Sequence, residues 1–279
     1  MDYKSTENWV LSRLPSYQAI GKKAYNPGLK NVVKFVSTLD LPIDSLNLIH
    51  VGGTNGKGST SSYISSILQE SNYQVGIFSS PHFFDFRERI KINNQKISKS
   101  FIVDFVNKYK SLIEELELSF FELSFCISLA YFVHNDVDYG VIEVGLGGRL
   151  DATNIINPLI SVITNISYDH TDILGNSLEM IALEKAGIFK KNSTIIIGER
   201  NDSVDEIFIN KANEVSSKIT FVPDYNDQKQ YSSVNYLNTN IKTAIYTCKA
   251  LNIENVDNKS IMTGISNICL LYTSPSPRD

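Results

Sequence analysis

The residues best suited to chemistry are a glycine-rich run that ends in a lysine and two hydroxyl residues. Residues 50–60 read His-Val-Gly-Gly-Thr-Asn-Gly-Lys-Gly-Ser-Thr. Glycines let backbone N–H groups close around phosphate oxygens, and the N-terminus of a following helix adds a favourable potential. Lys57 would reach the outer phosphates, and Ser59 or Thr60 would serve the nucleotide or its metal ion. The run predicts an ATP-binding loop rather than a simple glycine turn.

This loop needs a strand before it and a helix after it. Residues 46–49 form a short apolar run typical of a strand, and residues 61–68 have the pattern of a helix. The order strand, glycine-rich turn, helix is the arrangement that aims backbone N–H groups at a phosphate. The flanking elements therefore strengthen the assignment of a nucleotide site.

The rest of the chain alternates between predicted strands and helices. Residues 1–45 form a helical lead-in, with Ser5 or Thr6 able to cap its first helix. Further strands are predicted at 73–78, 138–144, 159–166 and 194–198, a hairpin at 89–94, and helices at 99–116, 121–134, 177–189 and 204–216. This alternation favours the α/β class with a mostly parallel, doubly wound sheet that carries a phosphate loop.

Four polar clusters follow directly after predicted strands, at residues 52–60, 79–82, 143–149 and 167–172. In open parallel sheets, ligands bind beyond the carboxyl ends of the strands. We therefore expect these four loops to converge on one site.

Within these loops, two ionisable residues are candidates for chemistry. Glu143 lies in an apolar run, where a carboxylate is costly unless it is paired or binds a metal. It is either a structural salt-bridge partner or a Mg²⁺ ligand beside the phosphate loop. His170 has Asp169 and Asp172 as neighbours, which favours a functional role over a structural one.

Other candidates stay open on spacing alone. Ser80 lies in a Ser-Pro turn, which is common in structural turns. Lys185 has the pattern of a solvated helix lysine. Gly145, Gly147 and Gly148 form either a tight turn or a close backbone approach to a ligand.

Seven motifs, in order and at compatible spacing, resemble the folylpolyglutamate synthase/dihydrofolate synthase branch of the Mur-ligase-like, ATP-dependent amide ligases. The motifs are GTNGKGS at 53–59, SSPH at 79–82, RERI at 87–90, FFE at 120–122, EVGLGGRLDATN at 143–154, DHT at 169–171 and EKAGI at 184–188. The resemblance runs from about Leu14 to the region of residue 250.

The resemblance implies a role for each matched position around the nucleotide. ATP is bound by the loop residues Gly53, Thr54, Asn55, Gly56, Lys57, Gly58 and Ser59, together with Asn240. Ser80 and Glu143 hold one Mg²⁺ ion, and His170 holds a second. Lys185 is carbamylated and helps to position that second metal ion. Lys57, His170 and Lys185 are thereby the catalytic residues.

The resemblance also assigns the organic substrate to two segments. The pterin-binding stretch comprises Ser119, Phe120, Phe121 and Glu122, and a second contact comprises Leu150, Asp151 and Ala152. Ser119 and Ser124 stand where the family usually has threonine, a change that keeps both hydroxyl groups.

The implied reaction is ATP-dependent addition of L-glutamate to dihydropteroate, to the γ-carboxyl of reduced folates, or to both, through an acyl phosphate. It has a place in folate biosynthesis and needs neither nucleic acid nor membrane, and we expect a monomer. One alternative is a Mur ligase of peptidoglycan precursor synthesis, disfavoured by the FFE stretch and by the lack of a preceding UDP-binding domain. The other is a non-catalytic nucleotide-binding fragment.

The last eleven residues differ in composition from the rest. Residues 269–279 resemble the translation of a sequencing-library adapter, and the alternative is a genuine disordered tail. We expect 1–268 to be the ATP-binding domain, with the helical pattern broken after Ile268. The family's C-terminal glutamate-ligase domain would then be missing, and the chain alone would bind nucleotide weakly and not turn over.

Composition sets broad limits on the class of protein. The 279 residues are 42% hydrophobic and 20% charged, as in ordinary globular proteins. The net charge of −4 does not support nucleic-acid or membrane-surface binding. No apolar stretch approaches the roughly 18–20 residues of a membrane span, and residues 1–7 lack the core of a signal peptide. Three cysteines at unrelated spacings indicate neither disulfides nor a zinc site, so we expect a cytoplasmic protein.

Overall fold

The computed structural model describes residues 1–14, 28–223, 231–232 and 234–272. Its centre is a sheet of eight strands in the order β4-β3-β2-β5-β1-β6-β7-β8. The strands are β1 (Leu48–Gly52), β2 (Val75–Phe78), β3 (Ile90–Ile92), β4 (Gln95–Lys96), β5 (Tyr139–Glu143), β6 (Ile160–Ile163), β7 (Thr194–Ile197) and β8 (Lys218–Phe221). All pairs are parallel except β2–β3 and β3–β4. The predicted α/β class with a mostly parallel sheet is confirmed.

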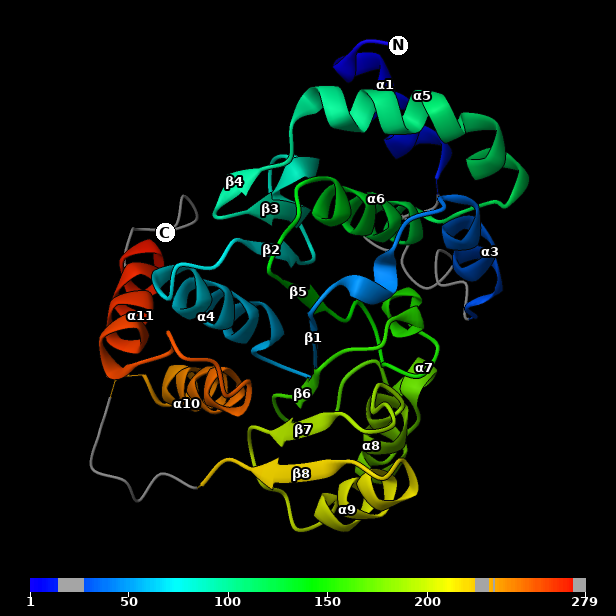
Figure 1. The fold of residues 1–279 in the computed structure, drawn as a ribbon. Helices are drawn as coiled ribbons and strands as arrows, with labels where there is room; N and C mark the ends of the chain where they lie inside the picture. Colours follow the sequence, from blue (N-terminus) through cyan, green and yellow to red (C-terminus); the bar gives the residue numbers. More distant parts are fainter. Residues whose placement is uncertain (15–27, 224–230, 233, 273–279) are drawn as a thin grey trace.

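Helices cover both faces of this sheet (Figure 1). The α-helices are α1 (Tyr3–Arg13), α3 (Lys30–Thr38), α4 (Lys57–Glu70), α5 (Lys99–Glu115), α6 (Phe120–His134), α7 (Thr171–Leu174), α8 (Leu178–Ala186), α9 (Asp205–Glu214), α10 (Asn235–Ala250) and α11 (Asn258–Tyr272). Short 3₁₀ turns lie at η2 (Ile43–Ser45), η3 (Phe86–Arg89) and η4 (Ala152–Ile155). One face carries α4, α10 and α11, and the other carries α6, α8 and α9, so the sheet is doubly wound.

The central strand β1 is buried at every residue. Its side chains alternate between the faces: Leu48 packs in the core under α6, whereas Ile49 and Val51 pack in the core under α4. A parallel strand covered on both faces has to be apolar on both, which explains the continuous apolar run in the sequence.

Two predicted helix starts are wrong, and each has a local cause. The first helix is capped by Asp2, whose carboxylate accepts the N–H of Ser5 at 2.7 Å, so the cap is not Ser5 or Thr6. The helix after the phosphate loop begins at Lys57 rather than at residue 61. Gly56 has a left-handed backbone (φ +79°), which lets the chain turn directly from loop into helix.

The C-terminal part of the fold also differs from the expectation. Helix α11 continues through Ile268 to Tyr272, so the helical pattern does not break at residue 269. The remaining tail, 273–279, and the part of the lead-in at 15–27 lie outside the described residues. Strand β8 and helix α10 were not predicted from the pattern.

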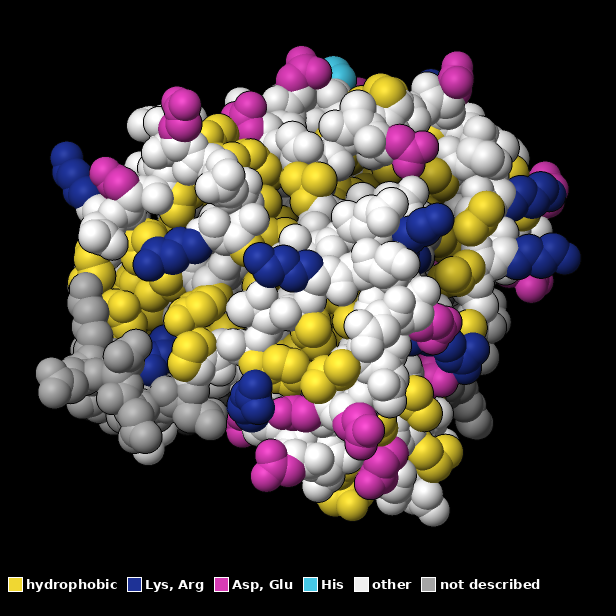
Figure 2. Space-filling model, turned by 60° about the horizontal axis from the view of Figure 1, so that its bottom comes forward, with side chains coloured by type: hydrophobic (Ala, Val, Ile, Leu, Met, Phe, Trp, Pro, Cys, Tyr) yellow, Lys and Arg dark blue, Asp and Glu magenta, His cyan; other side chains and the backbone are white. Residues whose placement is uncertain are grey.

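The surface has a mixed charge. Acidic and basic side chains are interspersed over the face shown in Figure 2, with hydrophobic side chains between them. None of the helices in the described part of the chain combines the length and apolar character needed to cross a lipid bilayer.

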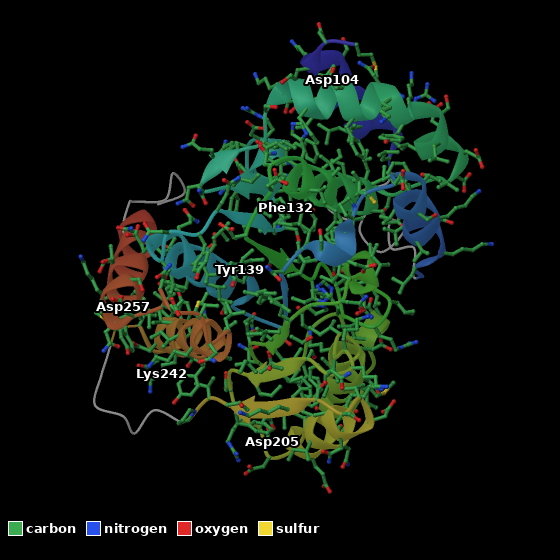
Figure 3. All side chains as sticks on the ribbon, viewed as in Figure 1. Asp104, Phe132, Tyr139, Asp205, Lys242 and Asp257 are labelled. Carbon is green, nitrogen blue, oxygen red and sulfur yellow. The ribbon has the colours of Figure 1, made fainter. Side chains whose placement is uncertain are left out.

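The contact between α6 and the sheet depends on a glycine. Phe132 of α6 and Tyr139 of β5, both labelled in Figure 3, belong to the cores on opposite faces. A Cβ atom on Gly76 of β2 would lie only 2.6 Å from a ring carbon of Phe132. The absence of a side chain on Gly76 therefore sets how closely α6 approaches the sheet.

We predict that Gly76→Ala lowers the free energy of unfolding by about 1–3 kcal/mol, because the added methyl group overpacks the core. Urea unfolding checks this prediction. Combining Gly76→Ala with Phe132→Leu should cost less than the sum of the two single changes, since leucine vacates the space of the ring. Parent-like stability of Gly76→Ala would contradict the packing described here.

Candidate active site

The phosphate loop joins β1 to α4 and has the two features that its sequence predicts. Gly53 and Gly56 have φ angles of +136° and +79°, and no side chain of the described residues caps the N-terminus of α4. A Cβ atom on Gly53 would collide with Thr164, and one on Gly56 would collide with the side chain of Asn240. Asn240, a buried residue of α10, therefore lies against the loop, next to the predicted nucleotide site.

The four predicted loops meet at the carboxyl edge of the sheet. Thr54 donates its backbone N–H to the carbonyl of Asn165 (3.0 Å) and its hydroxyl to the carbonyl of Ser167 (3.2 Å), which links the phosphate loop to the loop after β6. The backbone N–H of Ser80, after β2, donates to Oε2 of Glu143 at the end of β5 (3.0 Å). The predicted convergence is thus confirmed for these loops.

Two lysine side chains converge on one backbone carbonyl of the loop. Nζ of Lys57 donates to the carbonyls of Gly53 and Thr54 at 3.1 Å each, and Nζ of Lys185 donates to the Gly53 carbonyl at 2.9 Å. Lys185 is only 4% exposed, so its interpretation as a solvated helix lysine is wrong. Burial, followed by the charge of Lys57, lowers the pKa of Lys185 to about 7.

Glu143 is a buried carboxylate beside the start of α4. It is 4% exposed, and a Cβ atom on Gly58 would lie 3.7 Å from its oxygens. Burial raises its pKa to about 7, although the charge of Lys57 and the N–H of Ser80 oppose the rise. Among the described residues no salt bridge to Glu143 forms, which disfavours the structural alternative.

His170 lies at the same edge of the sheet but in a different setting. It has a left-handed backbone (φ +46°) at the start of the short helix α7. Its Nε2 lies 3.5 Å from Oδ2 of Asp169, and the imidazole is about a third exposed. Over the described ranges, no group of three or more His, Cys, Asp or Glu side chains is arranged to hold a metal ion.

The start of the predicted pterin stretch is a helix cap. The hydroxyl of Ser119 accepts the N–H of Glu122 (3.2 Å), and Oε2 of Glu122 accepts the N–H of Ser119 (2.8 Å). This reciprocal pair is a capping box, which the Ser-x-x-Glu spacing encodes. Phe120 is buried in the core, with the guanidinium of Arg89 lying 4.9 Å from its ring centroid. Ser119, Phe120 and Glu122 thus position the start of α6.

The two predicted substrate segments meet at Gly145. A Cβ atom on Gly145 would lie 2.6 Å from a ring carbon of Phe121 and 3.0 Å from Oδ2 of Asp151. Phe121 and Leu150 are half-buried, whereas Asp151 and Ala152 are buried. The turn after β5 therefore brings Phe121 and Asp151 together, and their assignment to one substrate-binding region stays a prediction.

A buried histidine was not singled out from the sequence. His50 of β1 is fully buried, and its Nε2 lies 2.8 Å from the hydroxyl oxygen of Thr153. Burial holds the pKa of His50 at about 3, against an ordinary 6.5, so the imidazole is neutral. A polar residue in an apolar strand was the signal that could have identified it.

Comparisons with known proteins agree with this geometry. Residues 51–269 match the Mur ligase middle domain. A Bacillus subtilis (strain 168) dihydrofolate synthase/folylpolyglutamate synthase is 40% identical over 201 residues, which are 70% of this chain and 45% of the relative. A structure of E. coli FolC in complex with DHPP and ADP has 29% identity and a TM-score of 0.78, covering 95% of this chain and 66% of that one. A bifunctional folylpolyglutamate synthase/dihydrofolate synthase with Mn, AMPPNP and L-glutamate bound has 26% identity and a TM-score of 0.78, with the same coverage.

The chain therefore belongs to the Mur ligase family. Within it, the resemblance to folylpolyglutamate synthases and dihydrofolate synthases is confirmed. The chain spans less than half of the length of the B. subtilis relative.

We predict that Gly56→Ala weakens binding of the ATP analogue AMPPNP at least tenfold, an estimate of about 1–3 kcal/mol for a strained backbone position. The methyl group would force a left-handed backbone on alanine and would collide with Asn240. Calorimetric titration measures the effect. Gly28→Ala is the matched control, because Gly28 also has a positive φ but no atom of the described residues lies within 4 Å of the added atom. Equal loss of binding in both variants would contradict this account of the loop.

We predict that acid destabilises the protein through His50. Because the folded pKa is about 3 and the ordinary value is 6.5, the unfolded chain binds the extra proton between these values, and stability falls as the pH falls through that window. Relative to His50→Gln, the parent should lose roughly 1.4 kcal/mol more per pH unit below pH 6. Urea unfolding between about pH 5 and pH 7 tests this, and equal slopes for the two proteins would refute it.

Proposed function

We propose that the protein is an ATP-dependent ligase that adds L-glutamate to dihydropteroate, to the γ-carboxyl of reduced folates, or to both, through an acyl phosphate. The observation that carries the proposal is the convergence of the phosphate loop, Glu143 and Lys185 at one sheet edge, next to the Gly145 turn with Phe121 and Asp151. Related proteins bind the matching ligands, namely ADP with DHPP, and Mn with AMPPNP and L-glutamate.

The residues present fit a first Mg²⁺ ion. Mg²⁺ prefers one or two carboxylates together with phosphate oxygens and water. Glu143 offers a buried carboxylate beside the loop, joined to Ser80 by a hydrogen bond. We propose that Glu143 and the Ser80 hydroxyl hold this ion and that nucleotide phosphates complete its shell.

A second ion is assigned to His170, with carbamylated Lys185 beside it. Carbamylation needs a neutral amine, which adds to CO₂ and releases a proton, leaving an anionic carbamate in place of a cation. The lowered pKa of Lys185 supplies that neutral amine near pH 7. The change of charge would also remove the repulsion between Lys185 and Lys57, which share the Gly53 carbonyl. When bound, the ions neutralise charge on the transferred phosphoryl group.

The chain's own groups mainly position the substrates and neutralise negative charge. The substrate carboxylate attacks the γ-phosphoryl group of ATP, which gives the acyl phosphate and ADP. The α-amine of glutamate then attacks the acyl carbon, and phosphate leaves as the amide forms. Lys57 and the N-terminus of α4 stabilise negative charge in the first step. Little general acid–base catalysis is needed, so the orientation of the substrates is the dominant contribution to catalysis.

We place this activity in the cytoplasm, in a monomeric protein whose ATP-binding domain comprises residues 1–268.

The proposal is tested by binding and by turnover of this chain. We expect Mg²⁺–AMPPNP and dihydropteroate to bind, and a UDP-linked peptide not to bind. Release of ADP that requires both L-glutamate and dihydropteroate would demonstrate the ligase reaction in this chain. Binding without release assigns the chain to the non-catalytic alternative, and the absence of nucleotide binding contradicts the proposal.

Glu143→Gln should weaken AMPPNP binding about tenfold or more in the presence of Mg²⁺ and leave metal-free binding unchanged, because only a metal contact is removed. Asp205→Asn is a matched control: Asp205 is also a buried carboxylate, but it lies on α9 at the far end of the sheet (Figure 3). Equal losses with and without Mg²⁺ would show that Glu143 is structural.

A further inference from the structure

His50 begins a chain of hydrogen bonds that leaves the sheet. Its Nε2 lies 2.8 Å from Oγ1 of Thr153, and that hydroxyl bonds Oδ1 of Asp151. Oδ1 also accepts the N–H of Thr153 (3.0 Å), and Oδ2 accepts the N–H of Leu146 (2.8 Å). Asp151 thereby connects η4 to the turn that follows β5.

The number of protons available decides which atom donates in each of these hydrogen bonds. Both oxygens of Asp151 accept backbone N–H groups, as those of an ionised carboxylate do. An ionised carboxylate only accepts, so the single hydroxyl proton of Thr153 goes to Asp151. Thr153 therefore has to accept from His50, which places the imidazole proton on Nε2. Nδ1 then remains a buried acceptor with no hydrogen-bond partner among the residues that the structure describes. Leaving a buried polar atom unpaired is costly, so the position of His50 calls for an explanation beyond packing.

The turn held by Asp151 packs against the helix that carries Lys185. A Cβ atom on Gly148 would lie 2.7 Å from the carbonyl oxygen of Glu184 and 3.0 Å from that of Lys185. Arg149 donates its backbone N–H to the Glu184 carbonyl at 2.8 Å. The end of α8 is therefore fixed by the same turn that Asp151 holds.

These contacts close into a ring. They run from His50 through Thr153 and Asp151 to the turn 145–149, then to α8, and from Nζ of Lys185 to the carbonyl of Gly53. Gly53 lies only three residues after His50 in the same strand and loop. A ring of this kind fixes the end of α8, and with it Lys185, relative to the phosphate loop.

We infer that His50 and Thr153 are positioning residues: through Asp151 and the turn 145–149 they hold the Lys185 amine over the phosphate loop. The inference rests on the proposed function, since it assigns Lys185 a task in nucleotide chemistry. It gives a reason for a histidine with an unpaired nitrogen: Nε2–H is the rigid donor that orients the Thr153 hydroxyl.

The test compares variants that break the ring with variants that keep it. Thr153→Val and His50→Leu remove a link, whereas Thr153→Ser and His50→Gln retain the hydroxyl and the donor. Thr247→Val is the matched control, because Thr247 is also a buried threonine whose hydroxyl bonds a backbone carbonyl (2.8 Å), but on α10, outside the ring. Each variant of the 279-residue chain is titrated with Mg²⁺–AMPPNP.

The ring-breaking variants should bind Mg²⁺–AMPPNP about tenfold more weakly, as is typical when a supporting residue is lost. Thr153→Ser, His50→Gln and Thr247→Val should bind like the parent, even where their melting temperatures fall. Parent-like affinity of Thr153→Val and His50→Leu would overturn the inference.

Two further measurements do not depend on nucleotide binding, so they separate this inference from the proposed function. In ¹⁵N-histidine NMR spectra, one resonance, absent in His50→Gln, should show the Nε2–H form and should shift in Thr153→Val. Lys185 should react faster with a small acylating reagent in Thr153→Val than in the parent, as followed by mass spectrometry. If the parent chain fails to bind nucleotide but both of these results are obtained, the ring is supported and the proposed function is refuted. An unchanged resonance together with an unchanged labelling rate would refute the ring.

Discussion

The carbonyl of Gly53 accepts hydrogen bonds from two lysine side chains, and the arrangement of the site depends on this contact. Two ammonium groups that share one oxygen repel each other, and burial disfavours the charge on Lys185. The surrounding structure therefore has to hold both lysine side chains at this carbonyl oxygen. Strand β1 fixes the carbonyl, α4 carries Lys57, and α8 carries Lys185 from the opposite face of the sheet. Strand β1 and the adjoining helix α4 are thus constrained together with the distant helix α8 by the repulsion between two lysine side chains, which negative charge at the loop would relieve.

Parallel strand order explains why so few residues are needed to build the site. Strands β2, β5, β1 and β6 are neighbours and point the same way, so their carboxyl ends deliver Ser80, Glu143, the phosphate loop and the loop with His170 to one edge. Backbone hydrogen bonds between the loops, such as that from Thr54 to Asn165, hold them together. The sheet therefore sets the positions of these loops relative to one another, which no single loop could fix.

Much of this was predictable from the sequence, because buried parallel strands and glycine turns leave strong patterns. Strand β8 was missed because Lys218 is exposed, its other three residues are only partly buried, and the strand ends the sheet. Asp2 displaced Ser5 as the first helix cap, since several nearby residues offer a suitable oxygen and only geometry chooses between them. The partner of His50 and the burial of Lys185 were out of reach for another reason: they depend on segments about a hundred residues away, which no local pattern reports.

Helix α4 is completed by a distant part of the chain. Its inner face packs against α10 and α11, and the hydroxyl of Ser66 donates to the carbonyl of Gly264, 198 residues further on. During synthesis α4 therefore leaves the ribosome long before α10 and α11, which pack against it. At about 5–20 residues per second, a ribosome takes on the order of 10–40 s to make the intervening segment. For that time the side of α4 that will face α10 and α11 is uncovered, and exposed apolar surface of this kind favours chaperone binding and aggregation of a nascent chain.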